Sequence, residues 1–304
     1  MRTGTKRALK ALAGAVGCGV LAAAAFVKVE TSRFDSSLDK VYDVPVPDIV
    51  ASKDPDVIAR GKHLATSLAG CSASACHGED FGGGSVTEVG PVATVVAPNI
   101  TGASLGAAYS DGELARLIHH GVKKDGRSVR FMPVQDVSWL PPQDVVAIVS
   151  FLRTVPSVER ESRPMTVKTL GKILDRQDKI ILDVARRVDH VRSETPPPPA
   201  PTAEYGAFLS RLCTSCHGEH LSGGPIPGAP SSLPTPLDLT PDESGLKDWT
   251  YDDFDKLMRT GVRKNGKPLD PFMPIDVIRN FDDVEMHALW AYLRTLAPVP
   301  LGGR

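Results

Sequence analysis

Apolar residues recur at helical spacing in a stretch of the chain that begins at Ser110. Leu114 and Leu117 fall on one face, Glu113 stands three residues after the serine, and Gly121 follows the last apolar residue. Serine and glutamate at this spacing form a capping box, and glycine is a common residue at a helix end. We therefore expect a short amphipathic helix between Ser110 and Gly121.

The same arrangement returns 140 residues later. Thr250 and Asp253 take the capping positions, Phe254 and Leu257 provide the apolar face, and Gly261 provides the stop. A pattern that recurs with its start, its apolar face and its end indicates an internal repeat.

The repeat extends well beyond this helix. Residues 98–156 match residues 237–298 at an offset of 140 or 141, and a Cys-His-Gly sequence at Cys76 matches one at Cys216. We therefore predict two copies of one domain. The predicted domains span residues 55–160 and 202–301.

Both copies are predicted to be all-α. Asp54 and Pro55 supply an N-cap and a first-turn proline for an opening helix in the first copy. Closing helices are expected at about 142–154 and 282–295. Neither copy has a convincing alternation of apolar and polar residues of the kind that marks a half-buried strand.

The N-terminus, residues 1–29, has the pattern of a targeting segment. Four basic residues lie within the first ten, and the run Ala11–Val27 carries no charge. This pattern is typical of a cleaved export signal or of a single membrane anchor, and the sequence leaves both open. Lipid attachment at Cys18 is less favoured, because the apolar run continues beyond it. Each version places the rest of the chain in the periplasm or at the outer face of the cytoplasmic membrane.

Two connecting segments complete the chain. Residues 30–54 are expected to form an extended polar tether. Residues 161–201 are expected to contain a helix from Pro164 to Val188, followed by a stiff proline-rich linker at 196–201. The apolar face of that helix packs against one domain or, as the lesser alternative, lies on a membrane surface.

Composition narrows the classes of partner. The net charge is −1, so the chain lacks the strongly basic character of a nucleic-acid-binding protein. Hydrophobic residues make up 41% of the chain but aromatic residues only 6%. These values permit a core that is completed by a buried cofactor.

The cysteines carry the clearest chemical signal. Cys213, Cys216 and His217 form a Cys-x-x-Cys-His sequence, in which two thiols one helical turn apart can add to the two vinyl groups of a haem. The next residue, a histidine, then faces the iron. Zinc binding and a disulfide are the alternatives for this pair.

The first domain departs from this spacing. Cys71 and Cys76 are separated by four residues, and His77 follows the second cysteine. Because the Cys-His-Gly end matches the other copy, we predict that haem attaches here as well. A strained disulfide or free thiols are the alternatives.

Two methionines are candidates for the sixth iron ligand. Met132 and Met273 occur in matched Phe-Met-Pro sequences between the last two predicted helices. A thioether is a soft, neutral ligand that favours ferrous iron. Other methionines and histidines lack a counterpart in the other copy and are better explained by packing or solvent exposure. These are Met258, Met286, His119, His120 and His220.

The loop before each methionine is basic, with Lys123, Lys124 and Arg127 in one copy and Arg263, Lys264 and Lys267 in the other. A solvated loop explains this charge. The alternative is a docking patch for an acidic redox partner.

Residues 55–301, apart from the central connector, resemble tandem class I c-type cytochromes. The resemblance rests on the two Cys-His-Gly motifs, the Phe-Met-Pro loops and the closing helices. Arg60-Gly61 and the Met-Pro loops are also similar to the cytochrome c subunits of membrane-bound alcohol and gluconate dehydrogenases, which carry three haems where this chain has motifs for two. The resemblance implies that the first and last helices of each domain cross, with haem filling the core.

The predicted function is electron transfer by two covalently bound haems c, with His/Met-ligated irons, between redox partner proteins that include a dehydrogenase or another respiratory component. No catalytic residue is expected. The alternative is a di-haem enzyme of the peroxidase type, in which one iron has an open site; the matched Met-Pro loops favour the carrier.

Overall fold

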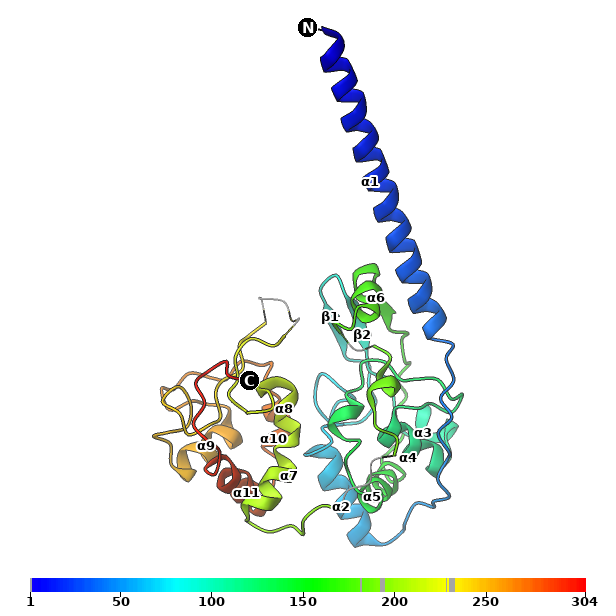
Figure 1. Ribbon diagram of the computed structural model, residues 1–304. Helices are drawn as coiled ribbons and strands as arrows, with labels where there is room; N and C mark the ends of the chain where they lie inside the picture. Colours follow the sequence, from blue (N-terminus) through cyan, green and yellow to red (C-terminus); the bar gives the residue numbers. More distant parts are fainter. Residues whose placement is uncertain (1, 181, 192–194, 228, 230–232) are drawn as a thin grey trace.

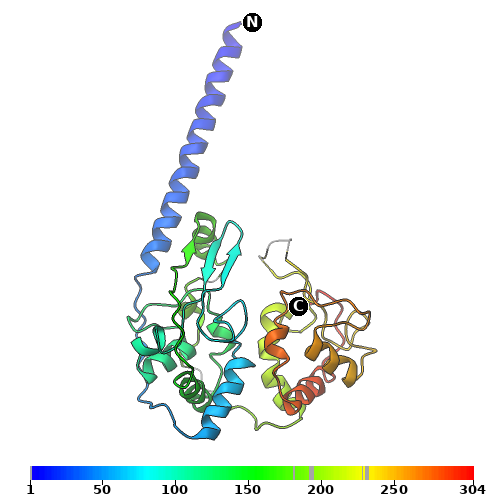
Figure 2. The same ribbon diagram turned by 180° about the vertical axis from the view of Figure 1, so that it is seen from behind.

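The computed structural model describes all residues except 1, 181, 192–194, 228 and 230–232, and for residues 2–11 it describes the backbone alone. Two rounded lobes lie beside each other, and a long N-terminal helix projects from the first (Figures 1 and 2). The helices and strands in chain order are α1 (Arg2–Ser37), α2 (Pro55–Thr66), β1 (Val86–Val89), β2 (Ala93–Val96), α3 (Leu105–Ala108), α4 (Asp111–His120), η1 (Val134–Asp136), α5 (Pro142–Leu152), β3 (Thr166–Val167), α6 (Thr169–Arg176), η2 (Val184–Arg187), α7 (Ala203–Leu209), α8 (Arg211–His217), α9 (Tyr251–Thr260), α10 (Ile275–Ile278) and α11 (Asp283–Leu293).

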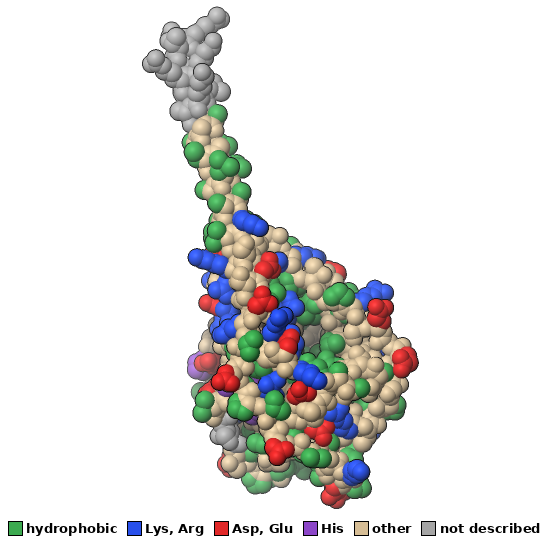
Figure 3. All heavy atoms as spheres, turned by 90° about the vertical axis from the view of Figure 1, so that its right-hand side faces the viewer, with side chains coloured by type: hydrophobic (Ala, Val, Ile, Leu, Met, Phe, Trp, Pro, Cys, Tyr) green, Lys and Arg blue, Asp and Glu red, His purple; other side chains and the backbone are tan. Residues whose placement is uncertain are grey.

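Helix α1 is long and apolar enough to cross a membrane. Its segment Leu12–Ser37 has a mean hydropathy of 2.0, and its most apolar window is not buried within the protein. Figure 3 shows hydrophobic side chains along it and charged side chains where it meets the first domain. The helix fits a signal or an anchor. It also continues to Ser37, so the prediction of an extended tether from residue 30 is wrong for the first eight residues.

The end of α1 is attached to the connector. Phe34 is 1% exposed, and Asp35 forms an ion pair with Lys172 of α6 at 2.7 Å. After the helix, the chain runs along the first domain in extended conformation, where Val41 pairs with Arg127 in an isolated β-bridge.

Each domain is built on a crossing of its first and last helices. In the first domain α2 crosses α5, and a Cβ atom on Gly61 would lie 1.8 Å from the carbonyl oxygen of Ala147. In the second, α7 crosses α11, and a Cβ on Gly206 would lie 1.9 Å from the carbonyl oxygen of Ala288. Glycine is required at both crossings because the backbones touch.

The predicted helix signals are present in the structure. Ser110 and Thr250 are N-caps with complete capping boxes, and Gly121 and Gly261 end their helices in the left-handed conformation with φ of 67° and 69°. The closing helices α5 and α11 also begin and end within two residues of the expected bounds.

The all-α prediction needs correction for the first domain. Strands β1, β2 and β3 form a small antiparallel sheet in that order, and 41% of the residues are helical. Three of the four residues of β1 are exposed, so it has no buried face to produce an alternating pattern. The last strand, β3, comes from the connector. In the described residues of 202–301 there is no named strand.

The connector is folded differently from the single helix predicted between Pro164 and Val188. It comprises β3, α6 and η2, with Asp178 at φ 56° just after α6. The Asp175 side chain accepts a hydrogen bond from the backbone N–H of Leu182 at 2.8 Å, which turns the chain back. The prediction that its apolar residues pack against one domain holds for Val184 and Val188, which contact Val134 of the first domain, but not for Leu170, which is 41% exposed; Ile181 lies outside the described residues.

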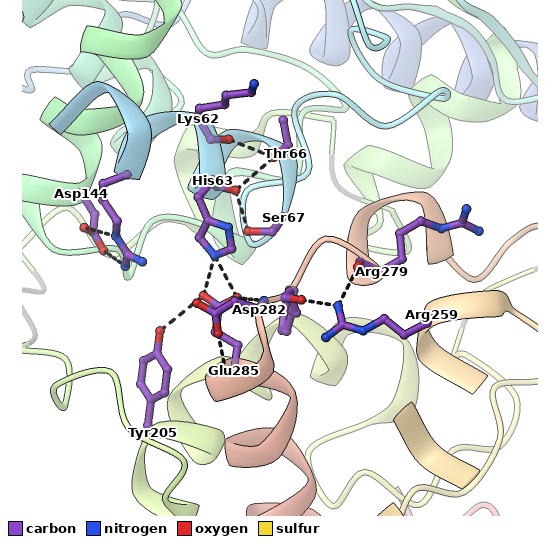
Figure 4. Close-up of polar contacts among 12 residues, drawn as sticks. Lys62, His63, Thr66, Ser67, Asp144, Tyr205, Arg259, Arg279, Asp282 and Glu285 are labelled. Carbon is purple, nitrogen blue, oxygen red and sulfur yellow. Dashed lines mark hydrogen bonds and ion pairs between the residues drawn. The ribbon is translucent and has the colours of Figure 1, made fainter. Parts of the chain in front are cut away.

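The two domains share one hydrophobic core. Trp139 of the first packs edge-to-face against Phe208 of the second, with ring centroids 4.6 Å apart. Beside this contact, His63 of α2 lies 2.9 Å from both carboxylate oxygens of Glu285, the buried capping residue of α11 (Figure 4). The ion pair between Arg60 and Asp144 lies close by at 3.0 Å.

Candidate functional site

The second cysteine motif lies on a helix. Helix α8 carries Cys213, Cys216 and His217 and begins two residues after α7 ends. All five cysteines are free thiols, so the structure contains neither disulfide considered for the two pairs. Burial raises the pKa of Cys213 and of Cys71 to about 12. Both are therefore neutral thiols in the absence of a bound group.

Both motif histidines are oriented in the same way. The Nδ1 of His217 donates a hydrogen bond to the carbonyl oxygen of Leu237 at 2.7 Å, and that of His77 donates to the carbonyl oxygen of Pro98 at 2.8 Å. This leaves Nε2 as the nitrogen for a metal. Burial lowers the pKa of both histidines. The rings are therefore held neutral, which is the form that binds iron.

The longer spacer of the first motif does not change the backbone that follows it. The backbone N–H of Gly83 donates to the carbonyl oxygen of His77, and that of Gly223 donates to that of His217, both at 2.8 Å. Within the spacer, the N–H of His77 donates to the carbonyl oxygen of Cys71 at 3.1 Å. The two extra residues are accommodated in turns before the histidine.

The second domain contains an apolar hollow beside its motif. Cys213 and Met273 both contribute to its walls, so the structure brings together two of the side chains predicted for this site. The other lining residues are Leu212, Leu239, Phe254, Met258, Ile278, Phe281, Leu289 and Leu293. The apolar lining and the oriented neutral histidine nearby are chemically compatible with a haem attached at Cys213 and Cys216.

Met132 of the first domain is placed differently. It packs against Val134, Val184 and Val188, and the last two belong to the connector. Met273 instead packs against the main core that also contains Phe254. The described residues of the first domain therefore do not show Met132 beside Cys71 in the way that Met273 stands beside Cys213.

The two sites contact each other's methionine segments. Ser74, in the first cysteine spacer, donates from its backbone N–H to the carboxylate of Asp276 at 3.0 Å. Ser215, in the second spacer, donates from its hydroxyl to the carboxylate of Asp136 at 2.5 Å. Asp136 and Asp276 lie four and three residues after the methionine of their own domain. Each attachment segment thus touches the other domain.

Two arginines that sequence analysis missed support the histidine loops. Arg160 donates to the carbonyl oxygen of Gly83 at 2.9 Å and pairs with Asp80 at 2.8 Å. Arg304 donates to the carbonyl oxygens of Cys216 and of Gly224, both at 2.8 Å. The repeat gives no signal for them, since they lie outside the matched residues. Leu237 and Pro98, in contrast, stand at the first positions of the matched segments.

Packing or solvent exposure accounts for most of the weaker candidates. The Nδ1 atoms of His120 and His190 lie 3.2 Å apart, and burial lowers the pKa of His120 to about 4. His220 is exposed, and Met286 is fully buried in the core. Met258 is the exception, because it lines the same hollow as Met273.

Comparison with known proteins agrees with this geometry. The family model described as Cytochrome c matches residues 58–156 and 203–297, which together make up more than half of the chain. The chain belongs to the cytochrome c family. It contains two tandem cytochrome c domains after an N-terminal apolar helix. Cytochrome c domains imply covalently bound haem c and support a role in electron transfer.

Several cytochrome subunits of dehydrogenases are similar to this cytochrome. The gluconate 2-dehydrogenase cytochrome c subunit of Pantoea cypripedii is 38% identical over 31% of this chain and 23% of its own length. The alcohol dehydrogenase (quinone) cytochrome c subunit of Gluconacetobacter polyoxogenes is 32% identical over 33% and 23%, and the fructose dehydrogenase cytochrome subunit of Gluconobacter japonicus is 31% identical over 35% and 24%. The matches span less than a quarter of these relatives.

Proposed function

We propose that this cytochrome is an electron carrier with two haems c. In the second domain, residues 202–301, Cys213 and Cys216 attach the haem and His217 and Met273 ligate its iron. In the first domain, residues 55–160, the matched residues are Cys71, Cys76, His77 and Met132. A bound haem supplies one-electron redox chemistry at each site.

The observation that carries the proposal is the second-domain hollow. It combines an apolar lining, a cysteine of the motif and a methionine, with His217 held by Leu237 nearby. The carbonyl of Leu237 fixes the ring so that Nε2 is available. The apolar walls exclude water, which lowers the reorganisation that a change of charge requires. The neutral thioether favours the ferrous state.

The reciprocal contacts support transfer between the sites. Ser74 with Asp276 and Ser215 with Asp136 hold each cysteine segment against the other domain. The shared core fixes the same arrangement. Electrons that reach one site would therefore pass to the other within the chain.

Location and partners are inferred from the N-terminus and the relatives. We propose that α1 exports the chain or anchors it at the outer face of the cytoplasmic membrane, with both domains in the periplasm. Because the relatives are cytochrome subunits of dehydrogenases, we propose a dehydrogenase as the electron donor and another redox protein as the acceptor. The cytochrome itself then performs no substrate chemistry.

A second candidate function rests on the placement of Met132. Because this residue packs with connector valines, the first iron would have an open position if the methionine stayed there. An open position is what a peroxidase of the di-haem type requires. In that function the second haem would supply electrons to the first.

The absorption spectrum of the purified full-length protein, with its haem-to-chain ratio, tests the proposal. We expect two low-spin haems per chain. Met273→Ala and Met132→Ala should each remove the methionine-linked band of one haem, while Met258→Leu, in the same hollow as Met273, should retain both. A native high-spin haem that persists in Met273→Ala and is unaffected by Met132→Ala would favour the peroxidase instead.

A further inference from the structure

The residues that follow the two histidine-binding carbonyls differ in charge. Pro98 and Leu237 accept the hydrogen bonds of the motif histidines, and the next residues along the chain are Asn99 and Asp238. Both side chains are buried, with 1% and 2% of their surface exposed. At matched places beside the two histidine loops, one domain therefore has a neutral amide and the other a carboxyl group.

The surroundings of Asn99 require an amide. Its Nδ2 donates to the carbonyl oxygens of Val158 and Arg160, at 2.7 and 3.2 Å. Its Oδ1 accepts from the backbone N–H and the hydroxyl of Thr101, at 2.9 and 2.7 Å. A carboxylate has no proton to donate to the two carbonyl oxygens, so an aspartate would be repelled at this position. The first histidine loop thus keeps an uncharged group.

The surroundings of Asp238 supply donors instead. The backbone N–H of Thr240 donates to its Oδ1 and the hydroxyl of Ser244 donates to its Oδ2, both at 2.7 Å. The same hydroxyl lies 2.7 Å from an oxygen of Asp242. Hydrogen-bond donors directed at a buried carboxyl group favour its ionised form. Among the described residues no basic side chain forms an ion pair with Asp238, so no partner neutralises its charge.

The charge of Asp238 acts at His217. Burial lowers the pKa of His217, and of the charged side chains Arg304 lowers it further whereas Asp238 raises it. The pKa of His77 is lowered by burial and raised only by its hydrogen bond to Pro98. A carboxylate that favours positive charge on the imidazole also favours the ferric over the ferrous state of an iron bound to that ring.

We infer that the buried carboxylate of Asp238 lowers the reduction potential of the haem proposed at His217, and that Asn99 leaves the first site without this effect. The inference rests on the proposed function. Arg304, which holds the same histidine loop, brings the opposite charge to the second site. The exchange of an amide for a carboxylate at one place thus helps to separate the potentials of two copies that share their motifs.

A spectroelectrochemical titration of the purified, haem-loaded full chain at about pH 8, where carboxyl groups are ionised, tests this inference. Two one-electron steps should describe the wild type. Asp238→Asn, which gives the second domain the residue of the first, should raise one step and leave the other in place. We expect about a tenfold change in the reduction equilibrium, which is about 59 mV for one electron. Arg304→Met should shift the same step to a lower potential.

Asp242→Asn is the matched control. It removes a carboxylate that bonds the same hydroxyl of Ser244 but is less buried than Asp238. Water and salt screen its charge, so the step should change by less than about twofold in equilibrium constant. Asp238→Ser, which is neutral and smaller than asparagine, should reproduce the shift of Asp238→Asn if the charge is its cause.

Three outcomes would overturn the inference. Unchanged potentials in both Asp238 variants would show that the carboxylate has no influence, and a shift to lower potential would contradict its sign. An equal shift in Asp242→Asn would assign the effect to the loop. A wild-type protein without a haem spectrum would overturn the proposed function, and the inference with it. A normal two-haem spectrum in the wild type and the variants confines a failure to the role of Asp238.

Discussion

The first and second domains share a helix crossing and differ in what lies over their methionine loops. Gly61 and Gly206 permit nearly the same backbone approach, within 1.8 and 1.9 Å of a carbonyl oxygen for an added Cβ. In the first domain, the tether and connector cover the loop, and the connector contacts Met132. In the second, the loop is open and Met273 lines a hollow. Both copies retain the same helix crossing. The tether and the connector cover the methionine loop of the first copy and leave that of the second exposed.

Removing the attachment cysteines should give the largest effect and tests whether both copies bind haem. We expect Cys213→Ser/Cys216→Ser and Cys71→Ser/Cys76→Ser each to lower the haem content from two per chain to one, because the thioether bonds can no longer form. Haem absorbance of denatured protein against chain mass measures this. Cys18→Ser is the control and should retain both haems. If only Cys213→Ser/Cys216→Ser lowers the haem content, the first motif, with its four-residue spacer, does not attach haem.

Adding a methyl group at the helix crossings tests whether the scaffolds are equivalent. Gly61→Ala and Gly206→Ala should each destabilise the protein by about 1–3 kcal/mol, since the added Cβ overlaps a backbone carbonyl. Thermal unfolding of the full chain measures the change. Gly14→Ala, where a Cβ meets no atom within 4 Å, is the control. If only one of the two variants lost stability, the two domains would differ in how their backbones adjust to the added Cβ.

The contact between His63 and Glu285 should give the smallest effect and tests how the domains are joined. The hydrogen bond with Glu285 raises the pKa of His63 above 6.5. A raised pKa of a histidine means that its stabilising contribution is fully present below pH 6.5 and is lost as the pH rises through the folded-state pKa. Glu285 is buried but His63 is partly exposed, so solvent screens the interaction and the pH-dependent contribution is about 1 kcal/mol.

The measurement is the melting temperature of His63→Asn at about pH 6 and about pH 9. The difference from wild type should be larger at the lower pH. His220→Asn, at an exposed histidine with no such partner in the described structure, is the matched control. If the loss of melting temperature in His63→Asn grew as the pH rose, the raised pKa of His63 would be contradicted.

Local signals in the sequence predicted the helices well. The capping boxes at Ser110 and Thr250 and the glycine stops combine start, face and end within a dozen residues, so neighbours in space add little. The sheet could not be predicted, because β1 is largely exposed and β3 comes from a segment about 70 residues away. The connector does not form the single predicted helix, because the Asp175 side chain accepts a hydrogen bond from the Leu182 N–H and the chain turns back. The spacing of apolar residues does not reveal such a hydrogen bond.

The repeat predicted the candidate residues of both sites but not their surroundings. Leu237 and Pro98 act through backbone carbonyls, which any residue supplies, so the sequence does not distinguish them. The contacts between domains depend on how the two copies pack. The pairing of His63 with Glu285 joins residues 222 positions apart and is visible only once the domains are placed.

The unequal cysteine spacers have a consequence for redesign. Shortening the first spacer by two residues would give both domains the same Cys-x-x-Cys-His sequence. The segment that would be shortened also contains Ser74, whose N–H and hydroxyl bond Asp276 in the other domain. Spacer length therefore contributes to the fit between the domains as well as to the proposed haem attachment. Shortening the spacer of the first domain would also alter its contact with the methionine segment of the second.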